Sequence, residues 1–418
     1  MTTAPRLALW LSLSLAVPAG AQPYDLLIRG GRLIDPANRV DAVMDVAVAG
    51  SRIAAVGERL EDAEAETVVD ASGLIVTPGL IDLHAHLFHG TQADSAYSDG
   101  PNALPPDGFT FRSGVTTAVD VGGSGWRDFP RFKAQVVDRS ETRVLAFLNI
   151  VGSGMKGGPV EQDLHDMVPR LTALRAAEFP DLIVGVKVAH YEGADWEAVD
   201  RAVAAGEAAG LPVMVDFGGT DPALSLEALL LTHLRPGDVL THAYAHVGGR
   251  EPIVGPDAVL RPFVPRARER GVLFDVGHGA GSFVFSQAVP ATRQGFYPDT
   301  ISTDLHRASM NAGMKDLLNV MSKLLNLGMP VADVIRAASA EPARVIRRED
   351  LGHLGVGAEA DVAVLRLRSG DFGFVDVRGD RLEGGQKLEC ELTLRGGRVV
   401  WDLNGLSRPP WSANPPGE

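Results

Sequence analysis

Two histidines, His84 and His86, are separated by a single residue in an apolar run at residues 80–87. Side chains at positions i and i+2 of a strand point to the same side, so the two imidazoles would converge. Convergent neutral imidazoles are a natural site for a divalent metal. The alternative is that both are ordinary polar residues at the end of a strand.

A lysine, Lys187, lies inside another apolar run at residues 182–188. An uncompensated ammonium in such a place is costly. The position therefore predicts one of two states. Either the ammonium pairs with a carboxylate, which the residue alone favours, or the neutral amine is converted to a carbamate that offers two oxygen ligands.

Three later apolar runs also end in ionisable residues. They end at His242, at His278 and at Asp304, and His306 follows two residues after the last of these. A carboxylate among such groups could ligate a metal and also accept a proton from water whose pKa the metal has lowered. His278 and His306 could instead lie behind the site or on the surface.

The elements that must position these residues lie between about residues 79 and 348. There, strand-like apolar runs alternate with longer segments of helical composition, which is typical of βα units and a parallel α/β sheet. Eight such units are the size of a (β/α)8 TIM barrel, whose active site lies at the C-terminal ends of the strands. The ionisable residues fall at those ends. The expected strands are residues 80–87, 115–121, 143–150, 182–188, 212–217, 238–244, 272–276 and 300–304.

Both ends of the chain have a different sequence pattern, in which short runs of alternating apolar and polar residues are broken by Gly, Asn and Asp. Antiparallel strands are expected near residues 26–29, 46–48, 53–56 and 74–76, and again near 361–367 and 392–401. The Gly396-Gly397 turn resembles Gly30-Gly31. We expect the two ends to pair into a small β-sandwich domain. The predicted divisions are residues 1–21 (signal peptide), 22–78 and 349–405 (β-sandwich), 79–348 (barrel) and 406–418 (Pro-rich tail).

The composition limits the partners and the ligands. The chain has 418 residues with a formal net charge of −14, which argues against a nucleic-acid or anionic-membrane partner. Its single cysteine, Cys390, excludes an intrachain disulfide scaffold and a Cys-rich metal site. Any metal must therefore be held by histidines and carboxylates.

The N-terminus predicts the compartment. Arg6 precedes an apolar run at residues 7–17 that is too short to span a bilayer. The small residues 19–21 form a cleavage pattern that would release a chain starting at Gln22. These features predict a signal peptide and a periplasmic or secreted protein. A buried N-terminal helix or a retained anchor is the alternative.

Taken together, these motifs resemble the metal-dependent amidohydrolase superfamily, specifically its dihydroorotase-like amidohydrolase/deacetylase group. The resemblance covers nearly the whole mature chain. It is specific because the motifs occur together, whereas each alone is weak. The stretches that carry it are residues 79–86, 114–121, 185–187, 237–242, 275–279, 301–306 and 321–329, the last running into the helix before 341–343.

The resemblance implies the ligand set. In the family, the strand-one pair holds one metal, and a carboxylated lysine bridges it to a second. Histidines on strands five and six hold the second metal, and an aspartate on strand eight ligates the first and acts as base. The residues that match are His84, His86, Lys187, His242 and Asp304.

The strand-five histidine does not match, because Asp216 stands at its position. Three alternatives follow. Asp216 could ligate the second metal through oxygen, His190 could reach in from the strand-four loop, or the site could hold a single metal. An aspartate adds negative charge and a harder ligand, which could shift preference from zinc toward manganese or magnesium. We expect one or two divalent ions, with zinc first and manganese as the alternative.

The implied activity is hydrolysis of an amide or ester acyl bond in a small N-acyl or O-acyl acid. Metal-activated water would attack, with Asp304 as base. We expect His278 and His190 to contact the substrate. Two glycine-rich stretches, residues 122–125 and 152–154, could offer N–H groups to an oxyanion or simply close tight turns.

Other functions stay open at this point. The same scaffold could hydrolyse cyclic amides, as a dihydroorotase or imidase does, or deaminate a nucleobase. It could also be a metal- or ligand-binding protein with a degenerate site. We expect a small-molecule partner and no nucleic-acid or membrane partner after signal removal, and a homo-oligomer is left open.

Overall fold

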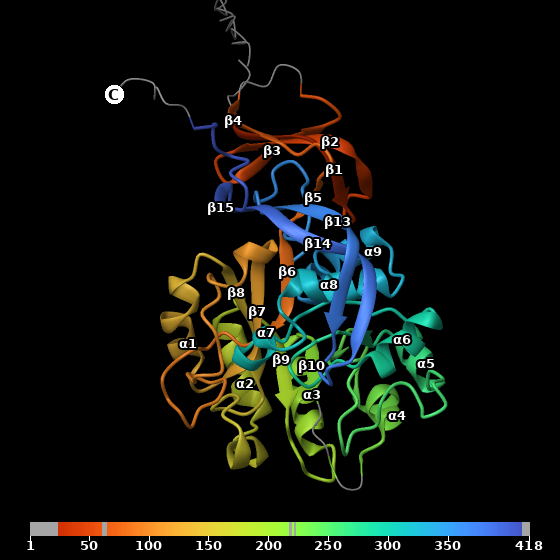
Figure 1. The fold of residues 1–418 in the computed structure, drawn as a ribbon. Coiled ribbons are helices and arrows are strands. Elements are labelled where there is room, and N and C mark those ends of the chain that lie inside the picture. Colours follow the sequence, from red (N-terminus) through yellow and green to blue (C-terminus); the bar gives the residue numbers. More distant parts are fainter. Residues whose placement is uncertain (1–23, 61–64, 217–219, 221–222, 412–418) are drawn as a thin grey trace, which may run out of the picture.

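The computed structural model describes residues 24–60, 65–216, 220 and 223–411 (Figure 1). The predicted signal peptide and its cleavage site lie outside this range, as does the end of the Pro-rich tail. Two sheets dominate the fold. In the described part of the chain, no helix is both long enough and apolar enough to span a bilayer.

Seven of the eight predicted strands form one parallel sheet. Each strand lies beside the one that precedes it in the chain, and every neighbouring pair is parallel. Parallel neighbours need crossover connections, which agrees with the predicted βα units. The strands are β6 (Leu80–Ala85), β7 (Val115–Gly125), β8 (Arg143–Asn149), β9 (Ile183–Ala189), β10 (Val213–Asp216), β11 (Val239–Leu240) and β12 (Leu273–Phe274).

The eighth expected strand, residues 300–304, is an irregular segment rather than a strand. It forms single bridges from Thr300 to Asp275 on one side and from Leu305 to Ala85 on the other. Asp304 has φ 51, outside the extended region, so the ladder is interrupted there. The segment nevertheless lies between β12 and β6, which places Asp304 beside the first strand.

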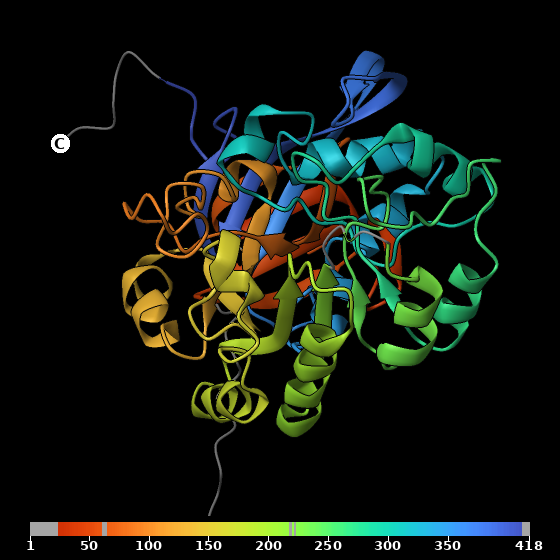
Figure 2. The ribbon, with the colours of Figure 1, turned by 90° about the horizontal axis from the view of Figure 1, so that it is seen from below.

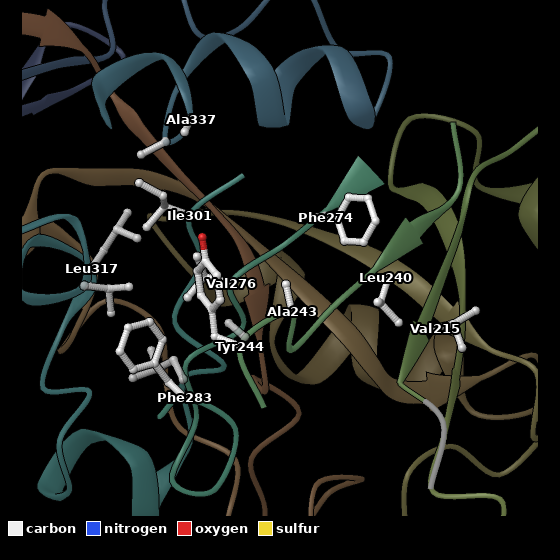
Figure 3. Packing of buried hydrophobic residues seen from close by; sticks show 14 of the residues in the cluster. Val215, Leu240, Ala243, Tyr244, Phe274, Val276, Phe283, Ile301, Leu317 and Ala337 are labelled. Carbon is white, nitrogen blue, oxygen red and sulfur yellow. The ribbon is translucent and has the colours of Figure 1, made fainter. Parts of the chain in front are cut away.

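The parallel sheet is apolar on both faces. Met214 and Val215 are neighbours on β10 but belong to different buried clusters, because successive strand residues point to opposite faces. The inner cluster contains Leu83 and Val119, and the outer one packs the strands against the helices. Figure 3 shows part of the outer cluster around Tyr244 and Phe283. Burial on both faces is typical of parallel sheets covered by helices.

Helices cover the outer side of the curled sheet (Figure 2). In α3, Ala198, Ala202 and Ala205 are buried at helical spacing, and Gly210 ends the helix in the left-handed conformation. The helices are α1 (Phe129–Gln135), α2 (Pro169–Glu178), α3 (Glu197–Ala209), α4 (Leu226–Ala228), α5 (Phe263–Glu269), α6 (Phe285–Arg293), α7 (Arg307–Asn311), α8 (Leu317–Asn326), α9 (Val331–Arg336) and α10 (Ala340–Val345), with the shorter turns η1 (Phe111–Ser113), η2 (Val137–Arg139), η3 (Gly158–Gln162) and η4 (Leu229–His233).

Strands from both ends of the chain share a second sheet, as expected. It has eight strands in the order β15-β14-β13-β5-β1-β2-β3, with β4 paired to β1. A two-layered sandwich stays a prediction. The strands are β1 (Tyr24–Asp35), β2 (Val40–Ala49), β3 (Arg52–Gly57), β4 (Ala65–Asp70), β5 (Ile75–Pro78), β13 (Val362–Val375), β14 (Arg381–Arg395) and β15 (Arg398–Asp402).

Two details of this sheet differ from expectation. The strands are not all antiparallel, because β4 and β5 run parallel to β1. Gly30-Gly31 is not a turn but an irregularity inside β1, where Gly30 at φ 68 shifts the register between β1 and β2. Gly396-Gly397 is the expected tight turn, with φ 56 and φ 78, and it joins β14 to β15.

The long hairpin of β13 and β14 descends from this sheet alongside the parallel-sheet part of the chain (Figure 1). Its strand β14 packs on α8, where the Leu388 N–H donates to Ser322 Oγ. At the hairpin tip, Asp376 accepts a hydrogen bond from the Phe285 N–H, and Arg378 donates to the His246 carbonyl. The C-terminal strands therefore reach the loops that follow β11 and β12.

Candidate metal centre

Donor atoms of three predicted ligands converge at the C-terminal ends of the strands. One atom each from His84, His242 and Asp304 can be chosen so that all three lie within 4.8 Å of one another, and all three residues are buried. His84 comes from β6, His242 follows β11, and Asp304 lies in the irregular eighth segment. Two imidazoles and a carboxylate are donors that zinc and manganese accept. The residues present therefore fit a divalent metal.

The orientation of His84 follows from its neighbours. Its Nδ1 lies 2.8 Å from Thr241 Oγ1, and the Thr241 hydroxyl lies 2.8 Å from Asp275 Oδ2. Because Thr241 donates its proton to the carboxylate, His84 Nδ1 carries the hydrogen and donates to Thr241. Burial lowers the pKa of His84 to about 3, so the ring is neutral. Its Nε2 lone pair is therefore free to face Asp304.

His86 and His242 complete the imidazole set. His86 Nε2 lies 2.9 Å from Asp304 Oδ1, and burial lowers the pKa of His86 to about 4. Its Nδ1 is buried and has no hydrogen-bond partner among the described residues. His242 Nδ1 lies 2.6 Å from the Gly277 carbonyl, which fixes that hydrogen and leaves Nε2 as the free nitrogen.

The Lys187 side chain is buried on the middle strand of the sheet, with 1% of the residue exposed. The ion pair that the residue alone favours is not formed with any carboxylate of the described residues. Burial lowers the pKa of Lys187, which favours the neutral amine. Gly122, at φ 90, makes room for its stem, because a Cβ there would lie 2.9 Å from Lys187 Cγ.

Asp216 lies at the end of β10 and is brought to the same centre. Its Oδ2 lies 3.3 Å from His242 Nε2 and 3.6 Å from His190 Nε2. Its Oδ1 accepts a hydrogen bond of 2.8 Å from Arg250. Burial alone would raise the pKa of Asp216, but His242 and Arg250 outweigh it and hold that pKa well below its usual value. Sequence reasoning missed Arg250, for which residue spacing offers no signal.

His190 follows β9, and its side chain is 47% exposed. Its Nδ1 lies 2.8 Å from Glu161 Oε2, a carboxylate that sequence reasoning also missed. Desolvation works against the charged ring, but Glu161 and Asp216 raise the pKa of His190 to about 9. Three residues of the centre, His190, His242 and Asp304, have left-handed φ values of 56, 58 and 51. Such strain is typical of functional sites.

His278 lies close behind Asp304 rather than in an open space. The residue is fully buried, its Nδ1 lies 3.0 Å from the Gly279 carbonyl, and Lys323 Nζ lies 2.6 Å from its Nε2. Its ring stacks on Phe283. Both ring nitrogens are thus engaged within the protein, and the expected substrate contact stays a prediction. His306 also lies at the centre, with Nδ1 2.7 Å from the Asp304 carbonyl.

Of the two glycine-rich stretches, residues 152–154 form a turn, which is the simpler of the two expectations, whereas residues 122–125 are the C-terminal end of β7. The Gly123 N–H donates to Asp120, the Gly125 N–H to Asp128 and the Gly154 N–H to the Val151 carbonyl. These N–H groups are already satisfied inside the protein.

A cavity of about 740 Å³ opens beside the centre. Tyr97 joins the two, because its ring lies 4.5 Å from that of His86. The cavity is therefore bordered by His190 and lies, through Tyr97, next to His86. Its walls are formed by Ala96, Tyr97, Gly157, Gly158, Pro159, Glu161, Gln162, His190 and Glu192.

Comparisons with known proteins show the family of the chain. The model of the amidohydrolase family matches residues 286–399. A deacetylase of Agrobacterium fabrum is 35% identical over 344 residues, which cover 80% of this chain and 81% of that protein. The chain belongs to the amidohydrolase family. A deacetylase of Enterococcus faecalis is 28% identical over 385 residues, which cover 90% of this amidohydrolase and 99% of the relative.

Solved structures show the same likeness. A structure described as an adenine deaminase has a TM-score of 0.81 and 26% identity, covering 91% of this amidohydrolase and 100% of that chain. Another, described as a dihydroorotase, has a TM-score of 0.79 and 30% identity, covering 90% and 99%. The family confirms the resemblance seen in the sequence. The amidohydrolase is therefore an enzyme that hydrolyses C–N bonds.

Proposed function

We propose that this amidohydrolase is an exported, metal-dependent deacetylase that hydrolyses the acyl amide or ester bond of a small N-acyl or O-acyl acid. The observation that carries the proposal is the convergence of His84, His242 and Asp304 beside the buried Lys187, which forms no ion pair with a carboxylate of the described residues. The adjoining cavity of about 740 Å³ suits a small molecule. The relatives named deacetylases support the acyl class.

Lys187 is assigned as a carboxylated lysine. Its neutral amine would add to carbon dioxide, forming an N–C bond and releasing one proton, and the carbamate would offer two oxygen ligands. With it, one or two divalent ions, zinc first, would bind here, polarise the acyl carbonyl and lower the pKa of water. The proposed ligands are His84, His86, Lys187, Asp216, His242 and Asp304.

Asp304 is assigned as the general base. Although burial alone would raise the pKa of Asp304, His306 and His86 hold it well below its usual value, so the group is an ionised carboxylate. It would take a proton from the attacking water and deliver it to the leaving nitrogen or oxygen as the acyl bond breaks. Gly279 leaves the room for this carboxylate, because a Cβ at φ 58 would lie 2.3 Å from Asp304 Oδ2.

The substrate is assigned to the cavity beside Tyr97 and His190. Of the two histidines expected to contact it, His190 lines this cavity. His278 does not line this cavity, so its substrate contact stays a prediction, and we propose that it also supports the backbone beside Asp304. We further propose that the exported protein has two domains. One is a barrel, residues 79–348, and the other is a β-sandwich made from residues 22–78 and 349–405.

Product analysis tests the reaction class. The zinc-loaded enzyme is incubated with N-acetyl and O-acetyl acids, a cyclic imide and adenine, with Asp304→Asn as the matched control. Acetate release by the parent enzyme and not by the variant supports the proposal. Ammonia release would make the enzyme a deaminase, and ring opening would make it a cyclic-amide hydrolase, the class of the dihydroorotase relatives. Either result overturns the acyl assignment.

A further inference from the structure

Only one carboxylate oxygen of Asp216, the residue at the strand-five position, is free to bind a metal. Asp216 commits Oδ1 to Arg250 and leaves Oδ2 between two imidazole nitrogens. Those separations are 3.3 Å to His242 Nε2 and 3.6 Å to His190 Nε2. Ligand atoms that share a tetrahedral ion at about 2.0–2.1 Å are about 3.4 Å apart. Each of these two separations is therefore close to the distance between neighbouring ligand atoms of one cation.

His190 is held as a metal ligand usually is. Glu161 is almost fully buried, its Oε1 accepts a hydrogen bond from the Gly157 N–H, and its Oε2 faces His190 Nδ1 at 2.8 Å. A carboxylate accepts only, so Nδ1 carries the hydrogen. A histidine that donates its far ring nitrogen to a carboxylate is the common arrangement for metal-bound imidazole. The near nitrogen, Nε2, then points at Asp216.

The backbone of His190 is held by Gln162, the residue that follows Glu161 in η3. Gln162 Nε2 donates to the His190 carbonyl at 2.8 Å, and its Oε1 accepts from the Glu192 N–H at 2.9 Å. His190 has φ 56, a strained value for a residue with a side chain. Glu161 and Gln162 therefore fix both the ring and the carbonyl of a residue that would otherwise relax away from the centre.

Arg250 holds Asp216 in a similar way. Its NH1 donates to Asp216 Oδ1 at 2.8 Å, and its NH2 donates to the Thr241 carbonyl at 3.1 Å. Thr241 precedes His242, so the guanidinium ties the end of β10 to the start of the loop that bears the next ligand. This bridge turns Asp216 Oδ2 toward His242 and His190.

We propose that His190 supplies the imidazole that strand five lacks, with Asp216 as its oxygen partner. Glu161 and Arg250 are the positioning residues for the two ligands. The inference rests on the proposed metal-dependent function and deepens it. It assigns two side chains, one after strand four and one on strand five, to the second ion in place of the single strand-five histidine of the family. The bound species is a divalent cation, and zinc is the ion used in the experiments.

The test counts zinc ions. The full chain is produced with zinc and bicarbonate, and zinc per chain is measured by elemental analysis after dialysis. We expect two for the parent protein and one for His190→Asn. In Glu161→Gln, we expect the affinity for the second zinc, measured by competition with a chelator, to fall by about 10- to 100-fold. Glu192→Gln removes another carboxylate of the same cavity and is the control, with zinc binding unchanged.

Cobalt substitution separates ligation from folding. The visible absorption of the cobalt protein reports the ligand set, so it should change in His190→Asn and Glu161→Gln but not in Glu192→Gln. Far-ultraviolet circular dichroism verifies that each variant is folded.

Two results would overturn the inference and leave the proposed function standing. One is a parent protein with one zinc. The other is a His190→Asn variant that keeps two zincs and an unchanged cobalt spectrum while its KM rises, which would make His190 a substrate contact. A parent protein that binds no zinc would overturn the proposed function itself.

Discussion

The side-chain nitrogen of Lys323 lies 2.6 Å from Nε2 of His278, and both residues are completely buried. Lys323 also donates to the Gly313 carbonyl at 2.7 Å, and no carboxylate of the described residues pairs with it. Because His278 Nδ1 faces the Gly279 carbonyl, its Nε2 is the acceptor. The Gly279 carbonyl thus sets the tautomer of His278, and the lysine on α8 donates to the nitrogen that this tautomer leaves free.

This contact predicts a pH-dependent stability. Burial lowers the pKa of Lys323 to about 7, below its unfolded value of 10.5. Burying the charged amine lowers the free energy of unfolding. This destabilisation is fully present below pH 7 and is lost as the pH rises toward 10.5. Relative to Lys323→Met, the parent protein should gain roughly 1 kcal/mol per pH unit in this window. Urea unfolding of both proteins between pH 6.5 and pH 9.5 measures the difference. A difference that does not change with pH would contradict this assignment.

Asp304→Asn should lower kcat by about 10²- to 10⁴-fold, because an amide cannot take the proton from water. Steady-state kinetics on the substrate found by product analysis measure the loss. Thermal unfolding and zinc content serve as the controls for folding and metal binding. A kcat within threefold of the parent value, with zinc retained, would remove Asp304 from the role of base.

Gly122→Ala should displace Lys187. The new Cβ would lie 2.9 Å from Lys187 Cγ at a backbone φ of 90. We expect a loss of about 1–3 kcal/mol in the free energy of unfolding and a fall in zinc content. Gly237→Ala is the matched control, because Gly237 has φ 91 and nothing lies within 4 Å of the Cβ position. Equal zinc content in the two variants would show that Gly122 does not serve Lys187.

Asp216→Ala should destabilise the protein apart from any effect on metal, because Arg250 is buried and loses this ion-pair partner. Breaking a buried pair on one side costs about 3–5 kcal/mol. Adding Arg250→Met should restore part of that stability without restoring the second zinc. Urea unfolding with a chelator present measures the stability, and elemental analysis measures the zinc. No recovery in the double variant would place the destabilisation elsewhere.

Asp216→His tests the choice of metal. Replacing oxygen by nitrogen should raise the preference for zinc over manganese. Activity is measured after removal of metal with a chelator and reconstitution with each ion. An unchanged ratio of zinc to manganese activity in both Asp216→His and Asp216→Ala would exclude a ligand role for Asp216.

Local patterns were sufficient for most strands of the parallel sheet. The apolar runs around His84, Lys187 and His242 each fall on a strand or its end, because period-two side-chain direction and burial on both faces are properties of short segments. The eighth segment was expected as a strand and is irregular. Its course depends on the side chains around it, such as the Thr303 hydroxyl that donates to Asp82.

The predicted ligands were found, but their partners were not. Glu161 and His190 are 29 positions apart, and Arg250 and Asp216 are 34 apart. Such pairs meet only when loops that follow different strands adopt one conformation, and neither spacing nor hydrophobic period contains that information. The contact of Lys323 with His278 could not be predicted either. In the sequence, Lys323 is one polar residue in an apolar helical stretch, and that pattern does not say which group its amine meets.

The sequence by itself determined the kinds of donor available, the strand ends on which they lie and the family to which the chain belongs. Each of these depends on residue type and local period. Only the tertiary structure decided which nitrogen of each histidine faces the centre, that Lys187 has no ion-pair partner among the described residues and that Asp216 is shared with Arg250. Those properties follow from hydrogen bonds and burial between distant segments, which exist only once the sheet has curled and its loops have met.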